Sequence, residues 1–361
     1  MALIPTTILT GFLGAGKTTL LNRILQEAHG HKIAVIENEF GPENIDNAIL
    51  VRDSNEQIIE MNNGCICCTV RGDLIEALGN LARQRAAGTL QFDRVVIETT
   101  GLANPGPVAQ TFFMDDEVAA HYMLDAIVTV VDARHAMQQL DAQEEAQRQV
   151  GFADRILLSK TDLVDEDAID ALTQRLRRIN PRAPIGRADF GRVPIADVLD
   201  LRGFNLNDKL EIDPDFLRAN DPGAHTHDEH QCDADCGHEH DHGHEHAHHH
   251  EHEHGHPHAQ HHHDQIAAFA FISERPFDSQ KLDEFLSSAI QVFGPQLLRY
   301  KGILWMAGGD RKVIFQGVHQ MMGTDLGAKW QDHEQRGSRM VFIGKDLPKD
   351  IFISGLQQCL V

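Results

Sequence analysis

The residues with the clearest capacity for chemistry are three cysteines in the stretch NGCICCTV. Cys65, Cys67 and Cys68 fall within four positions, although the whole chain of 361 residues has only six cysteines. The adjacent pair could form a disulfide only in a strained turn, which favours metal binding or redox chemistry over a structural bridge. Three thiolates, or two with Glu37 or Glu39, make a ligand set suited to Zn²⁺. A purely structural or redox role for these thiols stays open.

A phosphate-binding motif lies near the N-terminus, in the stretch GFLGAGKTT. It matches the pattern G-x-x-x-x-G-K-T/S between an apolar strand-like run and a helical one. Glycines allow backbone N–H groups to approach phosphates, and a helix N-terminus favours an anion. We expect Lys17 to reach the β- and γ-phosphates and Thr18 to hold Mg²⁺, the alternative being a glycine-rich turn without a ligand. The residues expected at the phosphates are Gly11, Gly14, Ala15, Gly16, Lys17, Thr18 and Thr19.

A second part of the nucleotide site is predicted in RVVIETTG, residues 94–101. Glu98 ends an apolar run and can bind Mg²⁺ through water, so it joins Lys17 as a candidate catalytic residue. The Gly101 N–H group can meet the γ-phosphate, which would allow this segment to distinguish GTP from GDP. A buried strand with a polar end is the alternative. No residue is assigned to activate water, and slow hydrolysis is expected.

The stretch RILLSKTDLVD indicates which base is bound. Ser159, Lys160 and Asp162 resemble the guanine-reading pattern N/T-K-x-D, in which the carboxylate accepts hydrogen bonds from guanine N1–H and its amino group. Adenine cannot offer that pair of donors, so Asp162 is the expected specificity residue. Lys160 is expected along the face of the base. Serine in place of asparagine is expected to weaken the contact with the far edge of the base, and an ordinary charged turn is the alternative.

These motifs each follow a predicted strand, which indicates how they are positioned. Short β-branched runs alternate with amphipathic segments, a pattern typical of an α/β fold with a doubly wound, mostly parallel sheet. Ligands bind at the carboxyl ends of such strands, so the phosphate motif, the base reader and the cysteines are expected along one edge. Helices are predicted at 18–28 and 73–85. The predicted strands are 6–10, 32–37, 57–61, 94–97, 126–131 and 155–158.

Composition limits the organisation and the partners of the chain. A formal charge of −22 repels phosphate backbones and anionic lipid, which argues against nucleic-acid or membrane binding. No apolar run reaches about 18 residues and no leader pattern is present, so a cytoplasmic protein is expected. Three regions are predicted: a P-loop domain at 1–205, a linker with a low-complexity segment at 206–264, and a small α+β domain at 265–361.

The linker holds an unusual concentration of histidine. Eighteen of the 24 histidines lie between His225 and His263, interleaved with acidic residues and accompanied by Cys232 and Cys236. Neutral imidazoles bind Zn²⁺, Ni²⁺ or Co²⁺, so the segment is interpreted as a tethered array of weak sites that feeds a tighter one. A solvated spacer that binds metal only incidentally is the alternative. The six other histidines are assigned no ligand role.

Taken in order, the motifs resemble the CobW/YjiA group of metal-delivery P-loop GTPases. The resemblance rests on GFLGAGKTTLLNRIL, IENEFG, NGCICCTVRGDL, VIETTG, ILLSKTD and RYKGILW, and it covers nearly the whole chain outside the His-rich segment. It implies a GTPase domain with a metal site at Cys65, Cys67 and Cys68, and a C-terminal domain that contacts partners. It also implies a role for Asp46 near Mg²⁺. Members of the group act on zinc, on cobalt for cobalamin synthesis, or in the activation of nitrile hydratase.

The leading hypothesis is a GTP-dependent metallochaperone that carries Zn²⁺ to a client metalloprotein, with Co²⁺ or Ni²⁺ as other metals and homo-oligomerisation left open. GTP with Mg²⁺ would hold one arrangement of the metal site and hydrolysis to GDP would release it. A metal-buffering protein with a non-essential nucleotide site is the main alternative. A small-molecule kinase on a P-loop fold is a third, against which the guanine-reading motif argues.

Overall fold

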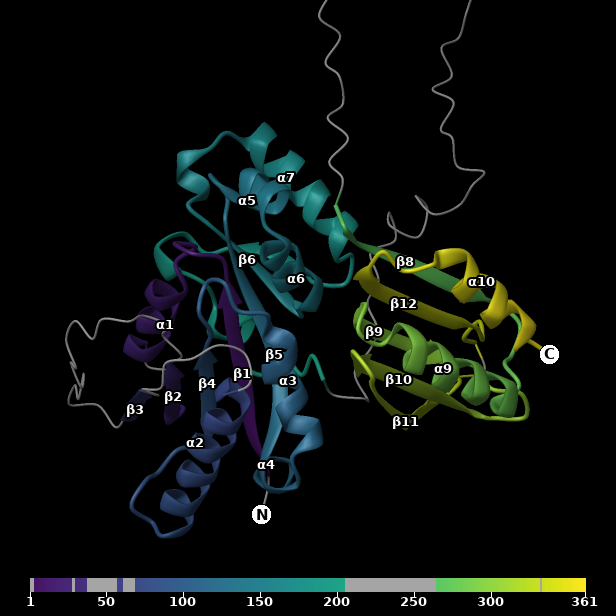
Figure 1. Cartoon of the computed structure of the whole chain (residues 1–361), viewed down its shortest axis with the longest axis horizontal. Helices are drawn as coiled ribbons and strands as arrows, with labels where there is room; N and C mark the ends of the chain where they lie inside the picture. Colours follow the sequence, from purple (N-terminus) through teal and green to yellow (C-terminus); the bar gives the residue numbers. More distant parts are fainter. Residues whose placement is uncertain (1–2, 28–29, 38–56, 61–68, 205–263, 332) are drawn as a thin grey trace, which may run out of the picture.

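The computed structural model describes residues 3–27, 30–37, 57–60, 69–204, 264–331 and 333–361, which form two sheets with their helices (Figure 1). Several sequence predictions fall outside these ranges and are not tested by the structure. They concern Glu39, Asp46, Cys65, Cys67, Cys68 and the His-rich segment.

Within the described residues, the first sheet has seven strands in the order β3-β2-β4-β1-β5-β6-β7. All neighbouring pairs are parallel, so every strand presents its carboxyl end at the same edge. The strands are β1 (Ile4–Gly11), β2 (Ile33–Glu37), β3 (Gln57–Glu60), β4 (Arg94–Glu98), β5 (Tyr122–Asp132), β6 (Arg155–Ser159) and β7 (Ile185–Arg187).

Helices cover both faces of this sheet, because its strands are apolar on both sides. One face packs against α1 and the segment around Val198 and Leu199, and the other packs mainly against α2, α3, α6 and α7. This confirms the predicted doubly wound α/β class. The helices are α1 (Lys17–Gln26), α2 (Thr69–Ala86), α3 (Pro105–Met114), α4 (Asp116–His121), α5 (Ala136–Ala142), α6 (Glu144–Phe152) and α7 (Glu166–Ile179), with short 3₁₀ turns η1 (Thr161–Leu163), η2 (Asp189–Gly191) and η3 (Ile195–Asp197).

The predicted elements differ from the observed ones mainly at their ends. All six predicted strands are present, and β5 begins four residues before the predicted position. The predicted helix start near Asp73 is wrong, because α2 already begins at Thr69, directly after Cys68. The short strand β7 was not predicted, since its three residues carry too little pattern.

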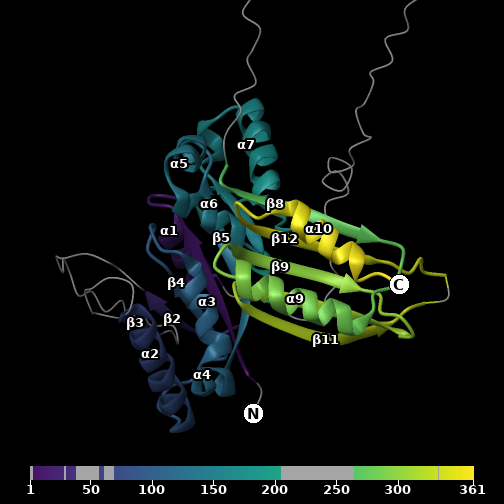
Figure 2. The ribbon, with the colours of Figure 1, turned by 45° about the vertical axis from the view of Figure 1, so that its right-hand side comes forward.

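The second sheet is antiparallel, in the order β11-β10-β9-β12-β8. Helices α9 and α10 lie on the same side of it (Figure 2), and their apolar residues pack on a Phe-rich face that includes Phe269 and Phe342. The elements are β8 (Ile266–Ser273), α9 (Ser279–Phe293), β9 (Leu297–Leu304), β10 (Arg311–Val318), β11 (Met321–Lys329), β12 (Ser338–Lys345) and α10 (Lys349–Gln358).

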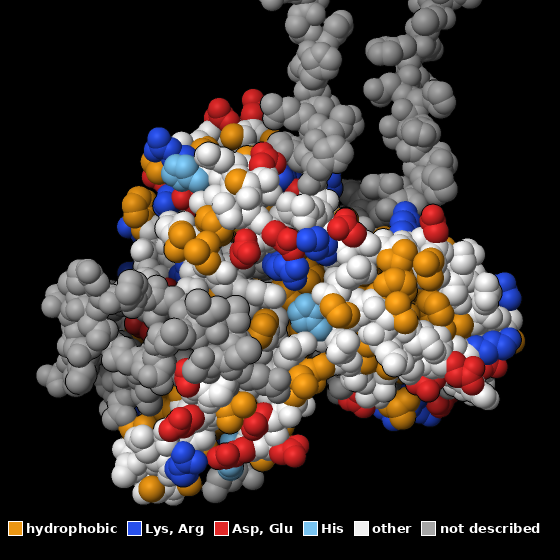
Figure 3. Space-filling model, viewed as in Figure 1, with side chains coloured by type: hydrophobic (Ala, Val, Ile, Leu, Met, Phe, Trp, Pro, Cys, Tyr) orange, Lys and Arg blue, Asp and Glu red, His pale blue; other side chains and the backbone are white. Residues whose placement is uncertain are grey.

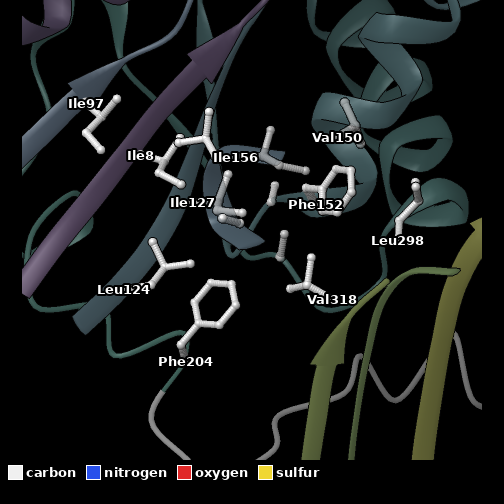
Figure 4. Close-up of a cluster of buried hydrophobic side chains, with 14 of the residues drawn as sticks. Ile8, Ile97, Leu124, Ile127, Val150, Phe152, Ile156, Phe204, Leu298 and Val318 are labelled. Carbon is white, nitrogen blue, oxygen red and sulfur yellow. The ribbon is translucent and has the colours of Figure 1, made fainter. Parts of the chain in front are cut away.

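The two sheets share one hydrophobic core. The second sheet turns its other face, with Leu298 and Ile343, toward Val150 and Phe152 of α6, and Figure 4 shows Leu298 opposite these residues. A buried ion pair crosses the same boundary: Arg299 Nη2 lies 2.9 Å from Asp154 Oδ1, with side-chain exposures of 0% and 3%. A shared core of this kind ties the two sheets together more firmly than a flexible linker would.

The surface in Figure 3 carries acidic and basic side chains side by side, with hydrophobic groups in small patches. Among the residues that the structure describes, no helix is both long and apolar enough to cross a membrane.

Candidate nucleotide-binding site

The phosphate motif forms the loop between β1 and α1, as predicted from the sequence. Gly14 and Gly16 have φ values of 72° and 97°, and a Cβ atom at Gly11 would lie 2.2 Å from the carbonyl oxygen of Val130. Side chains are disfavoured at all three positions, so the glycines serve the backbone geometry. The loop leads directly into α1, whose N-terminus offers unpaired N–H groups to an anion.

Lys17 begins α1 and is held at this loop. Its Nζ atom donates hydrogen bonds to the carbonyl oxygens of Gly11 at 2.8 Å and Phe12 at 3.3 Å. Burial lowers the pKa of Lys17 from its ordinary value, while the nearby charge of Glu98 acts in the opposite direction. The ammonium is therefore positioned and largely desolvated, which strengthens its attraction to a phosphate.

Thr18 and Glu98 come together at the edge of the sheet. Thr18 Oγ1 donates a 2.8 Å hydrogen bond to Glu98 Oε1. A hydroxyl and a carboxylate at the mouth of a phosphate loop are the oxygen ligands that Mg²⁺ takes beside a nucleotide, the carboxylate acting through water. The residues present therefore fit the predicted Mg²⁺ site.

Strand register places Glu37 beside Glu98. The two residues are paired across β2 and β4, and Glu60 is paired with Glu37 across β2 and β3. The chain leaves the sheet at Glu37 and at Glu60 on the edge where Glu98 stands. The cysteine segment begins after Glu60 and ends where α2 begins, although the cysteines themselves lie outside the described residues. In the part of the chain that is described, no group of three His, Cys, Asp or Glu side chains is arranged to hold a metal.

Gly101 lies against the phosphate loop. A Cβ atom there would be 2.6 Å from the backbone nitrogen of Leu13, so only glycine fits. Gln149 of α6 holds this segment by donating from Nε2 to the carbonyl oxygens of Gly101 and Ala103, both at 3.0 Å. Sequence reasoning missed Gln149, because nothing in its local pattern differs from an ordinary helical glutamine.

The base-reading motif follows β6 at the same edge. Ser159 Oγ donates to the carbonyl oxygen of Ala15 at 2.6 Å, so the serine ties the motif to the phosphate loop. Lys160 has a left-handed backbone with φ of 57°, and its Nζ lies 2.6 Å from Asp132 Oδ2. Asp162 is exposed in η1. Its predicted contact with guanine, and that of Ser159 with the far edge of the base, stay predictions.

Two carboxylates that the sequence analysis missed position the base reader. Asp132 accepts from Lys160 and also contacts His135 Nδ1 at 2.9 Å, and these hydrogen bonds lower its pKa although burial opposes the shift. Asp189 accepts from the Thr161 backbone N–H at 2.7 Å and from its hydroxyl. Asp132 ends β5, a strand that was predicted, so its position was an available signal; Asp189 lies beyond the short strand β7, which was not predicted.

The comparison with protein families follows the same two parts of the chain. Residues 5–187 match the CobW/HypB/UreG nucleotide-binding domain, and residues 266–360 match the C-terminal domain of the cobalamin synthesis protein CobW. The chain belongs to the CobW family. The assignment confirms the resemblance seen in the sequence and the expectation that this CobW-family chain is a nucleotide-binding enzyme of the GTPase class.

Individual relatives of this CobW-family chain are named for zinc. The chain is 38% identical over 347 residues to the zinc chaperone YjiA of Escherichia coli strain K12, covering 96% of each chain. It is 38% identical over 243 residues to the zinc-regulated GTPase metalloprotein activator 1 of Schizosaccharomyces pombe, covering 65% of this chain and 57% of the relative. The crystal structure of the Zn(II)-bound YjiA GTPase from E. coli superposes with a TM-score of 0.75 and 34% identity over 100% of both chains.

Proposed function

We propose that this protein is a GTP-hydrolysing zinc metallochaperone that delivers Zn²⁺ to a client metalloprotein under GTP control. The observation that carries the proposal is the pairing of Glu37 with Glu98 on adjacent strands, while Glu98 accepts a hydrogen bond from Thr18. The strand that leads toward the proposed metal site thus runs directly beside the strand that ends at the nucleotide site. The names of the relatives, a zinc chaperone and a zinc-regulated GTPase, support the same metal and nucleotide.

The residues of the nucleotide site have distinct tasks in this proposal. Lys17 and the backbone of the loop from Gly11 to Thr19 bind and orient the phosphates. Thr18 and Glu98 would hold Mg²⁺, which when bound neutralises charge on the β- and γ-phosphates. Asp162 selects guanine, and Gly101 donates its N–H group to the γ-phosphate. Intrinsic turnover is expected to be slow.

The proposed zinc site combines Cys65, Cys67 and Cys68 with Glu37 or Glu39, and it treats the metal as cargo. Thiolates next to the N-terminus of α2, which begins at Thr69, are favoured over thiols by the helix dipole. A change at the nucleotide reaches this set through Glu98 and its neighbour Glu37. The reduced thiols that this requires agree with a cytoplasmic location, and the client is proposed to bind the C-terminal domain.

The test is zinc affinity measured with a non-hydrolysable GTP analogue and with GDP. We expect the affinities to differ by about 5- to 150-fold, the range of a coupling of about 1–3 kcal/mol. The measurement is made on the full chain and on a chain lacking residues 221–264, so that the histidines do not obscure the cysteine site. A paired Cys67→Ser and Cys68→Ser variant is expected to lose the tight site. Equal zinc affinities in the two nucleotide states would refute GTP control.

The eighteen histidines between His225 and His263 favour a second candidate, a metal buffer with a non-essential nucleotide site. The two functions respond differently to Lys17→Ala. Loss of the ammonium that is hydrogen-bonded to Gly11 is expected to abolish cellular function if GTP is used, and to leave a buffer intact. A chain without residues 221–264 is expected to keep its cellular function if GTP is used, and to lose it if the protein is a buffer.

A further inference from the structure

Gln149 connects the segment beside the phosphate loop to the interior of the protein. Its side chain is 1% exposed, and its amide group donates to the carbonyl oxygens of both Gly101 and Ala103. Its own backbone oxygen accepts a 2.8 Å hydrogen bond from Thr129 Oγ1. The side-chain amide, which donates to two carbonyl oxygens, follows a displacement of those partners, because breaking its hydrogen bonds would leave buried polar groups unpaired.

The rest of α6 lies against the second sheet. Gln147 Oε1 accepts hydrogen bonds from the backbone nitrogens of Gln265 at 2.9 Å and Ile266 at 3.1 Å, where β8 begins. A Cβ atom at Gly151 would lie 2.8 Å from Leu298 Cδ1 of β9 and 3.3 Å from Ile266 Cγ2. The nine-residue helix α6 therefore contacts the Gly101 segment through the side chain of Gln149. It contacts strands β8 and β9 through Gln147 and Gly151.

A second contact leads from the same segment to the same domain. Asn104 caps α3 by accepting from the Gly106 backbone N–H at 2.9 Å. A Cβ atom at Gly106 would lie 2.6 Å from His319 Nε2, in the turn between β10 and β11, and 2.8 Å from Phe152 Cζ. The segment that follows Glu98 is thus held by Gln149 of α6 and also lies, at Gly106, against His319 of the second sheet.

The packing at Gln149 leaves room for movement. A small cavity there is lined by Phe12 of the phosphate loop, Thr129, Leu140 and Gln149 among others. Packing is therefore less complete beside Phe12 and Gln149 than at Gly151, whose contacts with the second sheet are close.

We propose that α6 carries the nucleotide state of the Gly101 segment to the C-terminal domain, with Gln149 as the positioning residue. The inference rests on the proposed role of Gly101 at the γ-phosphate. It adds to the proposed function a route by which GTP hydrolysis would change the conformation of the C-terminal domain, to which the client is proposed to bind. The coupling runs through packed rigid elements and needs no change in the metal site.

The test is hydrogen exchange on zinc-free protein with a GTP analogue and with GDP. In the wild type we expect exchange of peptides from α6, β8 and β9 to differ between the two states by about 5- to 150-fold. Gln149→Met, which keeps length but cannot donate, is expected to lose the difference in β8 and β9 while residues 11–19 still respond to the nucleotide. Gly151→Ala, at the far end of the helix, is expected to lose it as well.

Thr129→Val is the matched control, because it removes a buried hydrogen bond to the backbone of Gln149 and leaves the side-chain contacts intact. It is expected to keep the nucleotide-dependent difference. The inference is overturned if the wild type shows no difference in β8 and β9, if Gln149→Met keeps it, or if Thr129→Val loses it to the same degree. Because zinc is absent, these results are independent of the zinc titration that tests the proposed function.

Discussion

Thr18 Oγ1 donates a hydrogen bond of 2.8 Å to Glu98 Oε1 across 80 positions of sequence. The contact joins the first turn of α1 to the end of β4, two elements that the nucleotide motifs place at one edge of the sheet. It also holds the hydroxyl and carboxylate oxygens close enough together for both to lie near one hydrated cation.

Replacing Thr18 tests the cation site. Thr18→Ala removes the hydroxyl, and we expect GTP hydrolysis at saturating nucleotide to fall by about 10²- to 10³-fold, the usual loss when one electrostatic contact to the transition state is deleted. Steady-state phosphate release at several Mg²⁺ concentrations measures the effect. Thr18→Ser keeps the oxygen and should stay close to the wild type. Hydrolysis by Thr18→Ala at the wild-type rate would show that the hydroxyl has no part in catalysis.

Asp162→Asn tests the reading of guanine. The asparagine amide has one acceptor oxygen in place of two, so it cannot accept from both guanine N1–H and the guanine amino group, and GTP binding is expected to weaken by at least about tenfold, since one charge-assisted hydrogen bond contributes about 1.5–3 kcal/mol. Xanthosine triphosphate should bind better instead, because xanthine presents a carbonyl oxygen where guanine has the amino group. A competition assay between GTP and xanthosine triphosphate measures the ratio of the two affinities in the wild type and the variant.

The control for that experiment is Asp167→Asn, the same chemical change on the exposed first turn of α7. It should leave both affinities unchanged. Because Asp162 is itself exposed, neither variant is expected to alter thermal stability. An Asp162→Asn protein that still prefers GTP to the xanthine nucleotide would contradict the assignment.

The sequence predicted the parts of this site that are encoded locally. The spacing of glycine, lysine and threonine between Gly11 and Thr19 is typical of a phosphate-binding loop and of few other structures. Glu98 and Ser159 each end a strand with a strong apolar pattern. Parallel strands bring such ends to one edge, so the meeting of the motifs followed from fold class alone. The start of α2, which the structure has at Thr69, was placed too late, at Asp73.

Contacts between distant residues could not be predicted in this way. Gln149 reaches Gly101 across 48 positions, and Arg299 reaches Asp154 across 145. Neither pair has a local pattern, because the partners are set by how helices and strands pack. The shared core was hidden for the same reason: Leu297 and Leu298 are adjacent apolar residues on opposite faces of β9, and their pattern does not show which face packs against the first domain.

The pair of Arg299 and Asp154 predicts unequal effects of substitution. Arg299 also lies over the Phe204 ring at 3.4 Å, and the positive charges of Arg299 and Arg182 both act near the single carboxylate of Asp154. Asp154→Asn therefore leaves two buried cations uncompensated, and we expect it to lower the free energy of unfolding by about 3–5 kcal/mol. Arg299→Met should cost less, because Arg182 still balances Asp154.

Urea titration followed by circular dichroism measures both variants. The surface pair Lys329 and Asp310 serves as the control, since 69% and 67% of the two side chains are exposed. Asp310→Asn should change stability little, because water screens such pairs. If Arg299→Met proved the more damaging of the two interface variants, the charge balance assigned to this boundary would be incorrect.

His319 predicts a dependence of stability on pH. Burial lowers the pKa of its imidazole from 6.5, and the charge of Arg148 acts in the same direction, while backbone carbonyl oxygens near the ring partly oppose the shift. The unfolded chain therefore binds this proton more readily than the folded one. Stability from this residue is complete above about pH 6.5 and is lost as the pH falls through that value toward the lowered folded pKa.

We expect His319→Asn to flatten the fall in unfolding free energy below about pH 6.5. Asparagine tolerates the left-handed backbone of position 319, where φ is 52°, so the variant removes the titrating group without backbone strain. Urea titrations between about pH 5 and 8 in the presence of a chelator measure the slope, the chelator keeping metal off the His-rich segment. His121→Asn, at the exposed end of α4, should leave the slope as it is in the wild type. A slope unchanged by His319→Asn would show that the loss of stability at low pH comes from other groups and not from His319.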